Sequence, residues 1–148
     1  MKLITLSVRS GFLAGSLLLF SSPIRAQPGE SVVLTRLYTG SDGQTHAERT
    51  EVRFVHRADG IGLSPLVKAT GFFYLKLPAG HVQEWHPAPR RQYVIALSGR
   101  SEIELAGGEK IRLEPGTVIL AEDVTGKGHL SRCVGPQDCI VAEVPKAE

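Results

Sequence analysis

Three side chains that bind anions or transfer protons lie within seven residues of one another: His86, Arg90 and Gln92. Histidine donates or accepts a proton near neutral pH, and the guanidinium of arginine grips a carboxylate or phosphate through paired hydrogen bonds. In a strand, with its period of two, Arg90 and Gln92 share one face. The segment therefore predicts an anion site with a histidine beside it. The alternative for Arg90 is a solvated salt bridge with Glu84 or Glu122.

A second stretch with chemical potential is Thr-Gly-Lys-Gly-His at 125–129. It is not a phosphate loop. That motif joins a strand to a helix and has Ser or Thr directly after its lysine, whereas here Gly128 follows Lys127. The glycines instead predict a turn with unusual backbone angles. Lys127 and His129 are candidate ligand-binding residues beside this turn, and a plain turn without a ligand is the alternative. No Gly-x-Ser-x-Gly elbow of a hydrolase occurs.

The two cysteines, Cys133 and Cys139, are separated by five residues. This spacing is neither a thioredoxin motif nor a zinc knuckle, and an even, close pair in an exported chain predicts a disulfide. We expect two strands around a tight turn at 135–138 to place the two side chains opposite each other in a hairpin. Two buried free thiols, or a redox pair, are the alternatives.

The N-terminus has the composition of a secretory signal. Lys2 and Arg9 precede an apolar run at 12–20, and the small residue Ala26 closes the segment. The run is shorter than the roughly 20 residues that span a bilayer. We therefore expect residues 1–26 to be a cleaved signal peptide and the protein to be periplasmic or secreted. An uncleaved anchor or a misassigned start codon is the alternative.

Cleavage would reverse the sign of the net charge. The whole chain has 17 Lys and Arg against 15 Asp and Glu, a formal charge of +2. The first 26 residues hold three basic and no acidic side chains, so the remainder has 14 against 15 and a formal charge of −1. Such a balance offers no broad basic face to nucleic acid or anionic lipid. We expect neither a nucleic-acid partner nor a stable membrane span after cleavage.

Short runs rich in β-branched and aromatic residues alternate with Gly and Pro after residue 26. Strands are expected at 31–39, 50–55, 70–77, 83–86, 92–97, 101–105, 110–113, 117–121, 129–134 and 139–144. About ten short strands at 8–12-residue spacing predict an all-β sandwich or barrel. A chain of 148 residues has room for one domain, which we assign to residues 27–148.

From Gly80 onward the sequence resembles the cupin superfamily. The first cupin motif runs Gly, five residues, His, one residue, His, three or four residues, Glu, six residues, Gly. The matching positions here are Gly80, His86, Ala88, Gln92 and Gly99. Of the three metal-ligand positions only His86 keeps its residue, because Ala88 stands in place of the second His and Gln92 in place of the Glu.

The second cupin motif shows the same retained spacing with a replaced ligand. After Gly108 the chain reaches Pro115-Gly116, the turn typical of the family, and Ile119 stands three residues later where a His is expected. With the block at 121–129, these features resemble a group of small cupin-domain proteins. The resemblance covers about residues 70–144, the expected core, and implies a cupin-type double-stranded β-helix, which is a jelly-roll barrel.

The resemblance also bears on a metal cofactor. A cupin metal centre generally uses three imidazoles and one carboxylate, which suit Fe, Mn, Ni or Zn. Here it implies a rebuilt site of His86, Gln92 and His129 for one divalent ion, with Glu122 or Asp123 as an added carboxylate. The alternative is that His86 is an ordinary pocket histidine, hydrogen-bonded to a neighbour.

The cupin frame turns His86 and Gln92 into the barrel, and strand parity brings Arg90 to its mouth. We predict that His86, Arg90, Gln92 and His129 converge on one interior site, with His86 and Arg90 as candidate catalytic residues. Arg90, Gln92, Lys127 and His129 are the candidate ligand-binding residues. Affinity for an anion should rise as the pH falls through the range in which histidine becomes protonated.

These features predict an exported small cupin that binds a small organic ligand, with an anion favoured, with or without the help of a metal. One alternative is a metal-dependent cupin enzyme, namely a lyase, isomerase or dioxygenase. Another is a structural subunit that forms a homodimer. The sequence does not choose between an enzyme and a binding protein.

Overall fold

A computed structural model describes residues 31–147, which form strands, turns and loops. The predicted signal peptide lies outside the described residues. The strands are β1 Ser31–Thr39, β2 Thr45–Arg53, β3 Val55–His56, β4 Gly62–Leu63, β5 Phe73–Leu77, β6 Val82–His86, β7 Gln92–Ser98, β8 Arg100–Glu104, β9 Lys110–Leu113, β10 Val118–Glu122, β11 His129–Val134 and β12 Cys139–Pro145. Within 31–147 no helix is long and apolar enough to cross a membrane.

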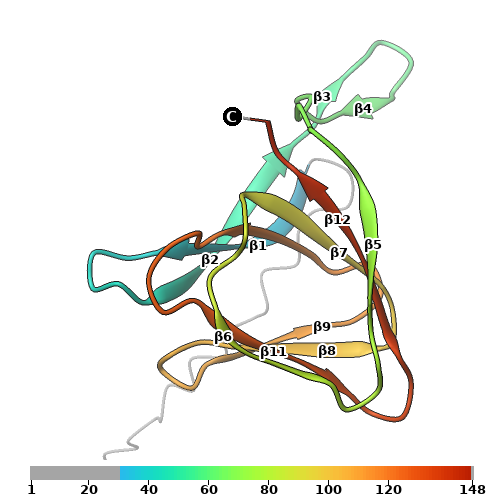
Figure 1. Ribbon diagram of the computed structural model, residues 1–148. Coiled ribbons are helices and arrows are strands. Elements are labelled where there is room, and N and C mark those ends of the chain that lie inside the picture. The colour runs from blue at the N-terminus through green and yellow to red at the C-terminus, as the bar shows by residue number, and fades with distance from the viewer. Residues whose placement is uncertain (1–30, 148) are drawn as a thin grey trace, which may run out of the picture.

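Two sheets face each other and enclose the interior (Figure 1). The larger has six strands in the order β2-β1-β10-β7-β12-β5, and the smaller has four in the order β6-β11-β8-β9. From β5 onward the chain passes repeatedly from one sheet to the other. Neighbouring strands are antiparallel, except that β1 runs parallel to β10. This arrangement confirms the predicted all-β jelly-roll barrel.

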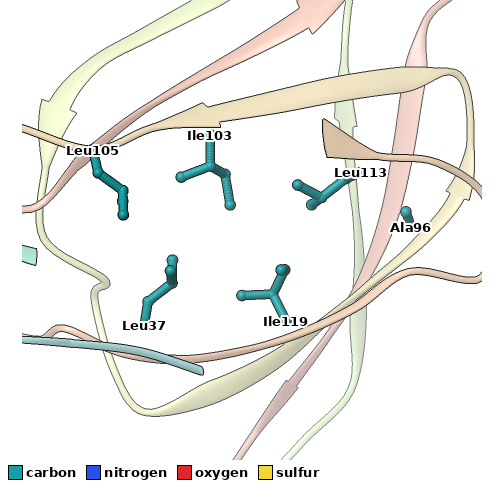
Figure 2. Packing of buried hydrophobic residues seen from close by; sticks show 6 residues of the cluster. All are labelled: Leu37, Ala96, Ile103, Leu105, Leu113 and Ile119. Atoms are coloured by element: carbon teal, nitrogen blue, oxygen red, sulfur yellow. The ribbon is translucent and has the colours of Figure 1, made fainter. Parts of the chain in front are cut away.

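A cluster of buried aliphatic side chains holds the two sheets together: Leu37, Ala96, Ile103, Leu105, Leu113 and Ile119 (Figure 2). Leu37 and Ile119 come from the larger sheet and face Ile103 and Leu113 of the smaller one. Leu37 and Ile119 have no exposed surface, and burying such a side chain contributes about 1.5–3 kcal/mol. The residue in the place of the second-motif histidine, Ile119, is therefore a core residue.

The strand predictions were correct for most elements and wrong between residues 45 and 63, where the structure differs from them in two ways. The second strand begins at Thr45 rather than at residue 50, because β2 pairs with β1 along its whole length, and pairing overrides the polar character of its first residues. No strand was expected between residues 55 and 70, but the short hairpin β3–β4 begins there and projects away from the barrel (Figure 1). Gly60 lies in its turn with a φ of 82°, a value that glycine adopts without strain.

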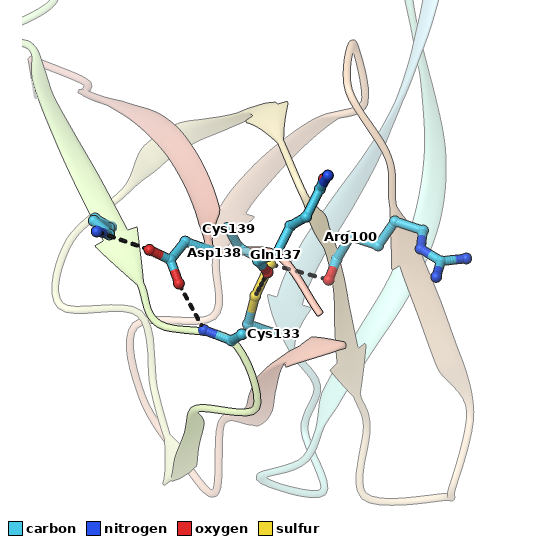
Figure 3. Close-up of a disulfide and its surroundings, with 7 residues drawn as sticks. Arg100, Cys133, Gln137, Asp138 and Cys139 are labelled. Atoms are coloured by element: carbon cyan, nitrogen blue, oxygen red, sulfur yellow. Dashed lines mark hydrogen bonds and ion pairs between the residues drawn. A yellow bond between two sulfur atoms is a disulfide. The ribbon is translucent and has the colours of Figure 1, made fainter. Parts of the chain in front are cut away.

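Cys133 and Cys139 form the predicted disulfide, with their Cα atoms 5.7 Å apart (Figure 3). The expected hairpin geometry is wrong. Cys133 lies on β11 in the smaller sheet and Cys139 begins β12 in the larger one, so the disulfide joins the two sheets at a corner of the barrel. Both cysteines are almost fully buried and pack with Leu77. At this corner Gly99 passes so close to Cys139 that a Cβ on it would lie 2.9 Å from the Cα atom of Cys139.

Candidate functional site

A cavity of about 520 Å³ lies between the two sheets. Most of its lining is aliphatic, including side chains of the core cluster. Nine polar side chains interrupt this lining. Four of them are Gln83, Ser101, Glu102 and Ser131. We call the other five the polar cluster: His86, Arg90, Gln92, His129 and Glu143. The cavity therefore joins a large apolar volume to a small group of titratable and hydrogen-bonding side chains.

Strand pairing brings His86 and His129 together. His129, the first residue of β11, is the register partner of His86, the last residue of β6, and the two ring centroids are 4.8 Å apart. Gly128 makes this approach feasible, because a Cβ at that position would overlap the backbone carbonyl of His86. The φ of Gly128 is 73°, which confirms the unusual backbone angle expected of this turn.

Hydrogen bonds orient the two imidazole rings. The Nδ1 atom of His129 lies 2.7 Å from Oδ2 of Asp123, and Nδ1 of His86 lies 2.6 Å from the backbone oxygen of Glu84. Both partners are oxygen acceptors, so each Nδ1 carries the proton in the neutral ring and each Nε2 has a free lone pair. The two histidines thus offer basic nitrogens at the cavity.

Gln92 and Glu143 face the cavity from adjacent strands. Gln92 is 3% exposed and Glu143 is 8% exposed. Burial raises the pKa of the Glu143 carboxyl, while a hydrogen bond from Gln92 and the charges of Arg90 and His86 partly oppose the rise. The Oε1 atom of Gln92 has no hydrogen-bond partner within the described part of the chain. A buried acceptor without a partner is costly, so Oε1 is suited to a donor on a ligand.

Arg90 lines the cavity from the bend that precedes β7 and is exposed, which places it at the mouth. Its guanidinium carbon is 5.7 Å from the ring centroid of Phe73. Among residues 31–147 it forms no ion pair within 4.0 Å, so the alternative salt bridges with Glu84 and Glu122 are not formed. Its fork of donors is free for a ligand.

Lys127 and Glu122 are not brought into the cavity. The ammonium of Lys127 lies over the ring of Trp85, 4.1 Å from its centroid, and Lys127 does not line the cavity. Glu122 pairs with Arg36 and Lys146, each at 2.7 Å. Adjacent residues of a strand point to opposite faces, and Ala121 on β10 lines the cavity, so Glu122 points to the outer side of the sheet. Both side chains are therefore satisfied away from the site.

Sequence reasoning missed Glu143 and left the role of Asp123 open. On β12, Cys139, Val141 and Glu143 share one strand parity. A buried disulfide at Cys139 indicates that side chains of the same parity on this strand point into the barrel. The sequence therefore contained a signal that Glu143 faces the interior. Asp123 has no comparable signal, because it lies in the loop after β10 and its contact with His129 arises from the return of the chain.

The residues present do not fit the cupin metal centre. Ala88 is buried and apolar, and Ile119 belongs to the core cluster, so two of the four ligand positions are apolar and cannot coordinate. Asp123 is engaged behind the ring of His129 rather than at its cavity side. Within residues 31–147 no three His, Cys, Asp or Glu side chains are close enough to hold a metal ion. The donors near the cavity are thus two imidazoles, the neutral amide oxygen of Gln92, which is a weak ligand, and the carboxyl of Glu143, which does not complete a group of three with the imidazoles.

The chain is similar to solved structures, but not to a protein-family model or a curated protein. No protein-family model matches the chain, and no curated protein matches it. A structure described as an RmlC-like cupin protein from Desulfovibrio desulfuricans is 16% identical, with 94% of this chain and 98% of that one covered and a TM-score of 0.40. The cupin domain of Cnp3 from Schizosaccharomyces pombe is 10% identical, with 80% and 85% covered and a TM-score of 0.43.

A third solved structure is described as an ethanolamine utilization protein Q from Salmonella typhimurium. It is 17% identical, with 78% of this chain and 96% of that one covered and a TM-score of 0.40. By its two-sheet strand order and its spaced motif glycines, the chain has the cupin-type fold.

Proposed function

We propose that this barrel binds a small organic acid, with the acid group at the polar cluster and the apolar body in the rest of the cavity. The observation that carries the proposal is the junction of an aliphatic cavity with one group of polar side chains. Its volume of about 520 Å³ lies within the range of pockets that take small molecules. An apolar lining with a few convergent polar groups is the usual composition of such sites.

The polarity of the cluster favours an anion. Arg90 has free donors at the mouth, and a guanidinium binds a carboxylate through two parallel hydrogen bonds. Two acidic side chains line the cavity, Glu102 and Glu143. Glu102 is paired with Lys110 at 3.1 Å and Arg132 at 3.8 Å, and burial raises the pKa of Glu143, which favours its neutral form. A neutral carboxyl donates a hydrogen bond to a carboxylate instead of repelling it. The charge balance at the cluster is therefore compatible with an incoming acid.

Calorimetric titration with hexanoate and hexanamide tests this proposal. We expect hexanoate to bind and hexanamide to bind at least tenfold more weakly, because a charge-assisted hydrogen bond is worth about 1.5–3 kcal/mol. Arg90→Gln should weaken hexanoate binding by a similar factor. Arg91→Gln is the matched control, because Arg91 is the next residue and does not line the cavity. Equal affinity for the acid and the amide would contradict the proposal.

We propose further that the protein acts outside the cytoplasm, after removal of residues 1–26. The disulfide between Cys133 and Cys139 supports this, since such bonds persist in oxidising compartments. Intact-mass analysis of protein recovered from periplasm or medium should give a chain that begins at Gln27. A mass that retains residues 1–26 would count against export.

A further inference from the structure

Asp123 and His129 form a buried hydrogen-bonded pair beside the cavity. Binding of an organic acid does not by itself require this pair. Asp123 has no exposed surface, and His129 is 6% exposed. Oδ2 of Asp123 accepts hydrogen bonds from Nδ1 of His129 at 2.7 Å and from the hydroxyl of Thr45 at 2.9 Å. Thr45 is itself 3% exposed. The Oδ2 atom therefore has two donors and orients the ring of His129, whereas Oδ1 has no hydrogen-bond partner within residues 31–147.

This arrangement gives His129 a role that His86 does not share. A carboxylate on Nδ1 fixes the tautomer and stabilises the imidazolium that forms when Nε2 takes a proton. The partner of His86 is the neutral backbone carbonyl of Glu84, which provides less stabilisation of a cation. His129 is consequently the better placed base of the two, and it lines the cavity.

We infer that the cavity is an acid–base active site in which His129, positioned by Asp123, removes a proton from the carbon next to the carbonyl of a small oxo acid. The inference rests on the proposed binding of a small organic acid, and it names the substrate class and the reaction. The base is a nitrogen of the chain itself, so the step requires no metal ion. His129 is the catalytic residue, and Asp123 is a positioning residue.

The step balances without an oxidant or a further reactant. The C–H bond breaks, and its electron pair forms the carbon–carbon double bond of an enolate while the carbonyl π pair moves to oxygen. The proton goes to Nε2 of His129. Return of a proton to the same carbon regenerates the substrate, and its delivery to the enolate oxygen gives the enol. The reaction class is therefore that of a tautomerase.

The remaining members of the polar cluster suit the same substrate. Arg90 is placed to bind the carboxylate, as in the proposed function. Glu143 in its neutral form is a hydrogen-bond donor for the oxygen on which charge develops, and burial, which raises its pKa, favours that form. Stabilising a developing oxyanion with a fixed donor in a water-poor site is an effective way to lower a barrier.

Proton exchange of 2-oxobutanoate in D₂O, followed by NMR at its C3 methylene, tests the inference. The wild type should exchange these protons faster than buffer, and His129→Gln should lose about 100-fold or more of that rate. Asp123→Asn should slow exchange about 10- to 100-fold. Asp42→Asn is the matched control, because Asp42, on the turn after β1, and His46, on β2, form an exposed pair at 3.1 Å. This variant should exchange the substrate protons at the wild-type rate.

Two parallel measurements separate the ways in which the idea can fail. Calorimetry of 2-oxobutanoate reports binding, so absent binding overturns the proposed function and the inference together. Retained binding with exchange no faster than buffer overturns the inference alone. Long-range ¹H–¹⁵N spectra of the wild type report the tautomer directly and do not depend on a variant that folds. Neutral His129 should be protonated at Nδ1, and protonation at Nε2 instead would overturn the role assigned to Asp123.

Discussion

Removing the disulfide should destabilise the protein by an amount that follows from its position. The two half-cystines are six residues apart, and in the chain-entropy relation the closure of so short a loop stabilises the folded state by about 2 kcal/mol. The side chains of Cys133 and Cys139 are 2% and 1% exposed and pack with Leu77. Truncation of both to Ala therefore adds about 1–2 kcal/mol of lost packing, for a total of about 3–4 kcal/mol.

Equilibrium unfolding in urea separates these two contributions. Reduced wild type keeps both sulfur atoms and should lose only the cross-link, about 2 kcal/mol. The double variant Cys133→Ala/Cys139→Ala should lose the full amount of about 3–4 kcal/mol, that is, about 2 kcal/mol for the cross-link and about 1–2 kcal/mol for packing. Its free energy of unfolding should be the same with and without reductant. A reduced wild type with an unchanged urea midpoint and slope would refute the reasoning, because it would mean that the corner of the barrel is held by packing alone.

Two further predictions concern charge and packing. Burial raises the pKa of Glu143 above its ordinary value of 4.5, so the stability contributed by its neutral form is present below pH 4.5 and is lost as the pH rises through the raised value. The melting temperature of Glu143→Gln should therefore rise relative to that of the wild type as the pH increases above 4.5, until the raised pKa of Glu143 is passed, and a constant difference would contradict this. Leu37→Ala should lower the free energy of unfolding by about 2–5 kcal/mol, whereas Leu66→Ala, 92% exposed, should change it by less than about 0.5 kcal/mol in the same urea titrations.

Most of the strand pattern could be predicted because most strands have a local signal of their own. The segment from Gln92 onward combines β-branched and aromatic residues with a period of two, and β7 begins at the expected residue. The sheet to which each strand belongs has no such signal. Cys133 and Cys139 are close in sequence and were therefore expected in one hairpin, yet the chain crosses from one sheet to the other between them. Crossing is decided by long-range pairing, which a local pattern does not contain.

The residues of the candidate site also differ in whether a local signal in the sequence indicates their direction. His86, Arg90 and Gln92 all line the cavity. His86 and Gln92 lie on strands, where the motif frame indicates direction, whereas Arg90 lies in the bend before β7. Lys127 was misplaced because it lies in a turn, where no periodicity sets direction, and the ring of Trp85 binds its ammonium. Glu143 was missed for a different reason: a charged residue at an interior position contradicts the rule that charges face solvent.

That contradiction is informative, because a fold keeps a buried ionisable group at a cost. Glu143 and Asp123 both lie in or against the interior, and each is paired with a partner that faces the cavity, Gln92 for the first and His129 for the second. A barrel that only needed a core could fill these places with apolar residues, as it does at Ile119, and such replacements are often neutral or stabilising. Ile119 fills one position of the cupin ligand frame with an apolar side chain, whereas the two buried carboxyls each contact a polar side chain that faces the cavity. If the cavity is the acid–base site inferred above, these two carboxyls are retained to hold and transfer a proton.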